Sequence, residues 1–204
     1  NTRQPIQVLG DLKAQLAACA IAERGFDEVL KRYGGSAVRP YMEAIMDQAE
    51  HMMRAFIRAI PDGDYRFTDW IDGLGEAPQT LRVVVCVSVR DDEIEVDFTG
   101  TSAQVQGAIN CPIAMSRSAT YCAIRCVTSP DIPNCEGYMR PVRFRAPEGT
   151  ILNPILPAAC GARGVMGYRV FDAIMGALAQ VVPERVVAAG EGGPTLFSVG
   201  GYHQ

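Results

Sequence analysis

The sequence predicts an α+β protein: an N-terminal antiparallel helix hairpin, then an antiparallel β-meander, then a mixed α/β C-terminal part. Apolar residues recur with a helical period up to about residue 60 and with a period of two from residue 65. Beyond residue 110, small-residue helical patterns alternate with short extended ones. Residues 1–204 are therefore expected to form one folded unit, in which residues 1–62 and 63–204 could be separate lobes.

Two helices account for the N-terminal part. The first is expected to begin at Asp11, a candidate N-cap, and to end at Gly34, a residue type common just after helices. The second is expected to run from Ser36 to Pro61 with a methionine-rich apolar stripe. Because two or three residues would join the helices, they should pack as an antiparallel hairpin.

Strands and further helices follow. The predicted strands cover residues 65–71, 81–89 and 93–98, with a tight turn at 90–92, and a fourth strand covers 138–146. In the fourth strand Val142 and Phe144 should lie on the face opposite Arg143 and Arg145. Helices are expected over residues 116–127 and 164–182.

Composition excludes several classes of function. The net charge is −4 and the basic residues are scattered, which argues against nucleic acid and anionic membranes as partners. No apolar run is long enough to span a bilayer. The seven cysteines form no CxxC pair and are expected to be reduced, mostly buried thiols of a cytoplasmic protein. The chain opens on NTRQP without Met and ends on a glycine-rich run, so it reads as an internal fragment.

The sequence contains no self-sufficient catalytic set. Its only histidines are His51, inside a predicted helix, and His203, and neither has a recognisable nucleophile beside it. Arg3, Arg140 and Arg163 sit in loop-like sequence, where arginine either recognises carboxylate or phosphate or forms a structural salt bridge. The catalytic residues are therefore left unassigned.

The richest segment for function is VDFTGTSAQVQGAIN, from Val96 to Asn110. Short polar side chains and glycines at the end of a strand let the backbone approach a ligand closely. The alternative is an ordinary loop whose polar groups cap one another. In this loop Gln104→Ala or Asn110→Ala is expected to cost less than about 1 kcal/mol of stability.

Five ordered blocks of sequence carry a family resemblance. They are NTRQPIQVLGDLKAQLAA, RAIPDGDYRFTDWIDG, VDFTGTSAQVQGAIN, IPNCEGYMRPVRFRAPEGTILNP and MGALAQVVPERVVAAGEGG. In this order they resemble the hydantoinase B/oxoprolinase family, which includes the B component of N-methylhydantoinase, the C-terminal part of 5-oxoprolinase and the α subunit of acetone carboxylase.

The resemblance implies an ATP-dependent hydrolase of cyclic amide C–N bonds that acts on a small molecule together with a hydantoinase A-type subunit, which binds the ATP. Phosphorylation of the amide oxygen would activate the ring for hydrolysis. A fragment alone would be inactive. The alternatives are the α-type subunit of an ATP-dependent acetone or ketone carboxylase, and a non-catalytic scaffold for the ATPase partner.

The matching blocks also imply a set of site residues. The family's metal ligands lie in an upstream GGTHxxD-like block that is missing here, so no metal ligand is assigned, and any divalent metal would be bound outside this sequence. The residues expected to line the substrate site are Asp11, Gln15, Ser102, Gln104, Asn110 and Arg140.

Overall fold

The computed structural model describes residues 4–72 and 79–191. Arg3 and His203 lie outside the described residues. The chain divides into two compact units, Asn1–Asp47 and Gln48–Gln204, and the boundary falls within the second helix.

The N-terminal unit contains helix α1 (Pro5–Tyr33) and the first half of helix α2 (Gly35–Ile57). The start predicted at Asp11 is wrong, because α1 begins six residues earlier with Gln4 at its N-cap and Pro5 as its first residue. The fixed φ of proline suits the first helical position, where no amide hydrogen is needed. Gly34 ends α1 as predicted: its φ is +78° and its N–H donates to the carbonyl of Leu30 at 2.8 Å.

A single residue, Gly34, joins the two helices. This connection is shorter than the two-residue to five-residue loops that let antiparallel helices pack side by side. Among the described residues, none of α1 is buried, so the packing expected of a hairpin is not seen. In the first half of α2, Val38, near the joint, is buried, whereas Tyr41, Met42 and Ile45 are exposed.

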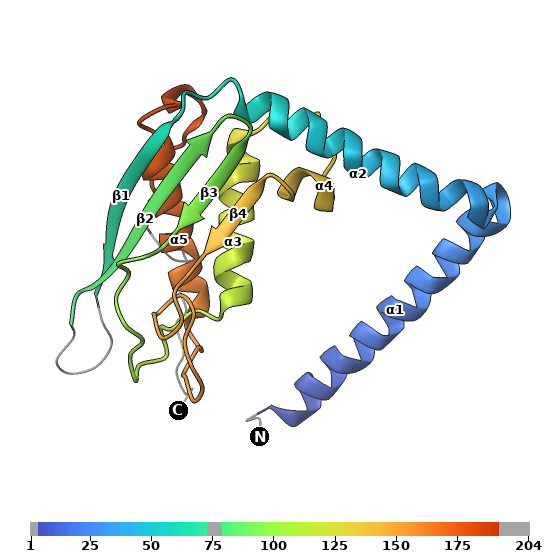
Figure 1. The fold of residues 1–204 in the computed structure, drawn as a ribbon. Coiled ribbons are helices and arrows are strands. Elements are labelled where there is room, and N and C mark those ends of the chain that lie inside the picture. Colours follow the sequence, from blue (N-terminus) through green and yellow to red (C-terminus); the bar gives the residue numbers. More distant parts are fainter. Residues whose placement is uncertain (1–3, 73–78, 192–204) are drawn as a thin grey trace, which may run out of the picture. The chain divides into compact units, whose positions relative to one another are not determined.

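The second unit is built on a four-stranded sheet of order β1-β2-β3-β4 (Figure 1). Its strands are β1 (Gly63–Ile71), β2 (Leu81–Arg90), β3 (Glu93–Asp97) and β4 (Val142–Arg145). The antiparallel meander of β1, β2 and β3 is confirmed, with Phe67 opposite Val85 and Val87 opposite Val96. Strand β4 runs parallel to β3.

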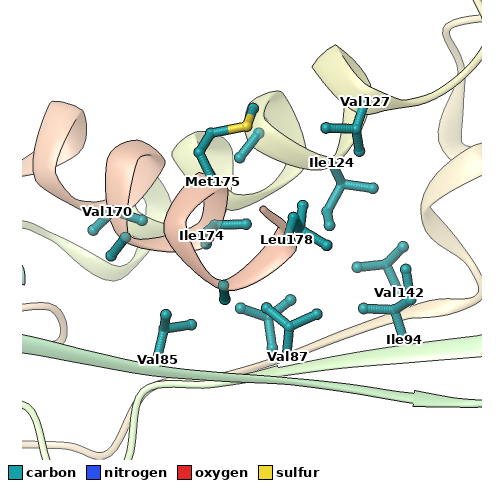
Figure 2. Close-up of a cluster of buried hydrophobic side chains, with 14 of the residues drawn as sticks. Val85, Val87, Ile94, Ile124, Val127, Val142, Val170, Ile174, Met175 and Leu178 are labelled. Carbon is teal, nitrogen blue, oxygen red and sulfur yellow. The ribbon is translucent and has the colours of Figure 1, made fainter. Parts of the chain in front are cut away.

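Two helices cover one face of this sheet, α3 (Ile113–Val127) and α5 (Arg163–Leu178) (Figure 1). Alternate residues of β2 point toward them because side chains of a strand alternate between its two faces. Figure 2 shows Val85 and Val87 beneath Ile174 and Leu178 of α5. All four side chains are fully buried, so the core of the unit lies between the sheet and the two helices.

The segment before β4 departs from the prediction. Residues Glu136–Met139 form a short helix, α4, and the strand begins only at Val142. Tyr138 therefore belongs to a helical turn and is buried, with Arg125 above its ring at 5.8 Å. Within β4 the predicted alternation holds, since Val142 is buried and Arg143 is exposed.

All seven cysteines are free. Only Cys86 and Cys111 are buried, so the expectation of mostly buried thiols is wrong; Cys19, Cys122 and Cys126 are exposed. Burial raises the pKa of the Cys111 thiol above its ordinary value. Within the described residues, no helix combines the length and the apolar character needed to cross a membrane.

Candidate functional site

Two loops that follow neighbouring parallel strands form one structure, here called the loop pair: residues 98–112 after β3 and 146–162 after β4. Main-chain hydrogen bonds join the two loops. Gln104 N donates to Gly149 O at 2.8 Å, Ile151 N donates to Ser102 O at 3.0 Å, and Cys111 N donates to Ile151 O at 2.7 Å. The predicted polar loop is therefore held by a segment about 50 residues later in the chain.

Ser102 attaches the loop pair to the sheet. Its hydroxyl oxygen accepts from Arg82 N at 3.0 Å, and its own N–H donates to Arg82 O at 3.0 Å. Thr101 makes a similar link, because its hydroxyl lies 3.1 Å from both the N–H and the carbonyl of Val84. These bonds continue the pairing of β2 beyond the end of β3 and fix the loop at its base.

The side-chain amide of Gln104 bonds to both backbone groups of one residue, as a neighbouring strand does. Its amide nitrogen donates to Ile155 O at 3.0 Å and its amide oxygen accepts from Ile155 N at 2.6 Å. Ile155 and its neighbour Leu156 are large apolar residues that are 52% and 88% exposed. Gln104 thus holds the backbone beneath an apolar surface of the loop pair.

Asn110 is fully buried, and both the oxygen and the nitrogen of its side-chain amide form hydrogen bonds within the loop pair. Its oxygen accepts from Val105 N at 3.0 Å, and its nitrogen lies 2.7 Å from Val105 O, 3.0 Å from Gly107 O and 3.0 Å from Ala159 O. Buried polar groups are costly unless they are paired, so Asn110 fixes the shape of both loops. This position contrasts with the surface loop that the sequence suggested.

Asp97 shapes the start of the loop. Its carboxylate accepts from the N–H of Thr99 at 2.9 Å and from the hydroxyl of Thr99 at 2.7 Å, and Arg145 of β4 lies 3.7 Å away. Gly100 follows with a φ of +97°, a conformation that favours glycine. Asp97 and Gly100 therefore turn the chain sharply out of β3.

Arg140 lies at the opposite end of these strands, just before β4 begins. Its guanidinium donates to the carboxylate of Glu50 at 3.0 Å, and Arg54 donates to the same carboxylate at 2.9 Å. The hydrogen bonds from Arg140 and Arg54 lower the pKa of the Glu50 carboxyl below its usual range. Arg54 also pairs with Asp92 of the β2–β3 turn at 2.7 Å, which ties α2 to the sheet.

Asp11 and Gln15 lie one turn apart on α1, and both are exposed. They belong to the N-terminal unit. Of the six predicted site residues, the structure therefore brings Ser102, Gln104 and Asn110 together. Their substrate-binding role stays a prediction.

A cluster that the sequence did not indicate lies between β1 and α5. Arg169 of α5 donates to Asp69 of β1 at 3.1 Å and to Asp172 at 2.6 Å, and these side chains are only 14%, 20% and 10% exposed. Arg169 Nε is buried and has no hydrogen-bond partner within the described residues. The three residues line a cavity of about 250 Å³ together with Phe67 and Gly176. The available signal was an arginine and an aspartate three residues apart on a helix that is otherwise uncharged after Arg163.

An apolar groove of about 480 Å³ lies between α3 and α5. Small residues of both helices line it, Gly164 and Gly167 of α5 and Ala119 and Cys122 of α3, and Phe171 adds an aromatic wall. The signal in the sequence was the recurrence of glycine on one stripe of α5. No group of three or more His, Cys, Asp or Glu suited to a metal ion occurs among residues 4–72 and 79–191.

Comparison with known sequences gives a consistent result. The profile described as Hydantoinase B/oxoprolinase matches residues 1–204. The putative B component of a D-/L-hydantoinase from Pseudomonas sp. (strain NS671) is 38% identical over 199 residues, which are 92% of this chain and 34% of that protein. The beta component of caprolactamase from Pseudomonas jessenii is 34% identical over 191 residues, which are 93% of this chain and 33% of that protein. The chain thus spans about a third of the length of these relatives.

Solved structures agree with the sequence comparison. The ATP-dependent caprolactamase from Pseudomonas jessenii superposes with a TM-score of 0.79 at 33% identity, covering 88% of this chain and 31% of that one. Nucleotide-free acetone carboxylase superposes with a TM-score of 0.80 at 18% identity, covering 89% of this chain and 26% of that one. The second similarity is evidence of a shared fold alone.

Proposed function

Because the chain belongs to the hydantoinase B/oxoprolinase family, we propose that it is part of a cytoplasmic, ATP-dependent enzyme that hydrolyses the C–N bond of a cyclic amide. The observation that carries this proposal is the similarity to caprolactamase in both sequence and structure, at 34% and 33% identity. A caprolactam ring is a cyclic amide, and so are hydantoin and 5-oxoproline. Two relatives are named as single components, B or beta, of enzymes with more than one kind of chain, which supports a partner for this chain.

The loop pair is the proposed wall of the substrate site in this chain. The hydrogen-bonding groups of the Ser102, Gln104 and Asn110 side chains are engaged with the backbone, so these residues act by holding the loop pair in one shape. Such rigidity matters because a reacting amide must be held close to its catalytic groups. Asp11 and Gln15 are exposed and can offer a carboxylate and an amide to substrate, whereas Arg140 is positioned by Glu50.

ATP belongs in this proposal to a hydantoinase A-type partner subunit, where it supplies the phosphoryl group that makes the amide oxygen part of a good leaving group. Any divalent metal would be bound by residues outside this sequence. The role left to this chain is to position the ring and to keep the loop pair in place.

The test is an assay of ATP hydrolysis by the protein that carries this chain, copurified with its hydantoinase A-type partner. Hydantoin, 5-oxoproline and caprolactam are added separately, and the ring-opened acid is measured by mass spectrometry. We expect one of these amides to stimulate ATP hydrolysis, and the rate of ATP hydrolysis to rise together with the rate of ring opening. Gln104→Ala should lower turnover about tenfold or more, since small misplacements at a site are costly. Gln106→Ala, a change at an exposed residue of the same loop, serves as the matched control.

Two results would replace this proposal. Stimulation by acetone with bicarbonate, and by none of the amides, would assign a ketone carboxylase, the alternative that the family resemblance includes. If no substrate of either kind stimulates ATP hydrolysis, yet the partner still copurifies, the chain serves as a scaffold.

A further inference from the structure

Within the N-terminal unit, helix α1 carries an apolar seam whose residues are exposed, apart from the half-buried Leu30. Its positions are spaced alternately by three and four residues, the spacing by which helices pair in a coiled coil. The seam consists of Leu9, Leu12, Leu16, Cys19, Glu23, Phe26, Leu30 and Tyr33, with Glu23 as its one charged member. Leu16 is 71% exposed and Tyr33 is 58% exposed. A helix with such a seam is expected to have a helical partner, because solvated leucines on one stripe favour association.

We propose that the seam pairs with the same seam of a second copy of this chain as an antiparallel coiled coil. With the helices antiparallel and the longest overlap, Leu9 lies opposite Tyr33 of the other copy, Leu12 opposite Leu30, and Leu16 opposite Phe26. All apolar seam positions but Cys19 are then matched by another apolar residue. Cys19 and Glu23 face each other in the two central layers.

The charges beside the seam favour this direction and register. In an antiparallel pair the positions that directly follow Leu12 and Phe26 flank the seam on one side, and these are Lys13 and Asp27. Lys13 of each copy then lies near Asp27 of the other, so the two-fold axis produces two pairs of opposite charge.

The parallel arrangement lacks these pairs. Each residue would face its own counterpart, so Glu23 would meet Glu23, and neither Lys13 nor Asp27 would meet an opposite charge across the seam.

Ala20 and Ala22 flank the centre of the seam, and their small side chains leave room for the backbones to approach. Glu23 costs stability at the centre, but a single polar residue in a seam also restricts the register.

The test is the oligomeric state of the 204-residue chain, measured by sedimentation equilibrium over a range of concentrations. We expect a monomer–dimer equilibrium that Leu16→Asp shifts toward monomer by at least about tenfold in Kd, the scale of a central interface residue. Ile21→Asp is the matched control, because Ile21 is an exposed apolar residue, 62% exposed, on the face of α1 away from the seam. Circular dichroism of each variant monitors the helix content.

A charge exchange separates this pairing from other partners. Lys13→Asp and Asp27→Lys should each weaken the dimer, and the double variant should restore it. Glu23→Leu should strengthen it. A chain that is monomeric at every concentration overturns the proposal and assigns the seam to another chain or segment. A dimer that Leu16→Asp and Ile21→Asp weaken equally, or that the double exchange does not restore, overturns it as well.

Discussion

At the scale of single residues, Asn110 contributes most to holding the two loops of the loop pair together. Its amide is fully buried and bonded to Val105, Gly107 and Ala159. Asn110→Ala would leave part-buried backbone groups of Val105, Gly107 and Ala159 without this partner, at a cost of up to about 1–3 kcal/mol each. We therefore expect a loss of about 2–4 kcal/mol in the free energy of unfolding, more than the sequence suggested.

Urea unfolding of Asn110→Ala, Gln104→Ala and Gln106→Ala measures this expectation. Gln104→Ala should cost about 1 kcal/mol, because its two bonds to Ile155 lie nearer the surface. Gln106→Ala should stay within about 0.5 kcal/mol, as exposed substitutions usually do. Equal losses for Asn110→Ala and Gln106→Ala would contradict the structural role assigned to Asn110.

Residue chemistry predicted where the polar loop lies, but not which way its side chains point. The run from Thr99 to Asn110 identifies a strand exit rich in hydrogen-bonding groups. Whether Asn110 faces solvent or protein depends on residues 146–162, which cover it from far along the chain. The Arg169 cluster was missed for the same reason, since Asp69 and Arg169 meet only when β1 and α5 pack.

At the scale of elements, an acidic residue of α2 couples this helix to Arg140, which ends α4 just before β4. Hydrogen bonds from Arg140 and Arg54 lower the folded-state pKa of Glu50. A lowered carboxyl pKa adds stability above the pKa of the unfolded chain, about 4.3, and this contribution is lost as the pH falls through the folded pKa. We expect Glu50→Gln to destabilise the protein at pH 7 and to flatten the acid limb of its stability curve. Thermal unfolding from pH 7 to pH 3 checks this, and an unchanged acid limb would contradict it.

Two glycines of α5 offer a matched test of helix packing. A Cβ at Gly176 would lie 2.7 Å from the ring of Phe67 in β1, whereas a Cβ at Gly167 would lie 2.8 Å from the terminal methyl of Met115. A methionine methyl can move aside, but three ring atoms cannot move without shifting Phe67 itself. Gly167→Ala should be neutral or slightly stabilising, because alanine favours helix by about 1 kcal/mol. Gly176→Ala should cost about 1–3 kcal/mol. Thermal unfolding compares them, and the reverse order would contradict the packing described.

Elements with a long, regular pattern were predictable, and irregular ones were not. Alternating apolar residues placed β2 to within one residue, at Leu81–Arg90. The early start of α1 at Pro5 was missed because Asp11 offered a plausible cap inside a helix that continues through it. The pattern predicts strand where α4 forms, because Tyr138 is a large, largely apolar residue only four positions before β4.

At the scale of the whole molecule, the sequence predicts the antiparallel meander and the order of the helices and strands other than α4. It could not show that β4 is parallel to β3, because the pairing depends on the crossover through α3. Nor could periodicity show that the chain divides at Asp47, since the apolar stripe of α2 continues across this boundary.

The parallel pairing of β4 also orders the folding reaction in time. The turn at Asp91 and Asp92 brings β2 and β3 together over a short stretch of chain, whereas β4 can join only after a much longer loop has closed. The amides of Ile94 and Phe98 donate to Pro141 and Arg145, so they report this late step. In pulsed hydrogen exchange during refolding, these two amides should become protected after those that pair β1 with β2. Simultaneous protection would instead show that the sheet forms in one step. If the order holds, the loop pair takes shape after the meander of β1, β2 and β3, and a variant that slows this step will become compact before it becomes active.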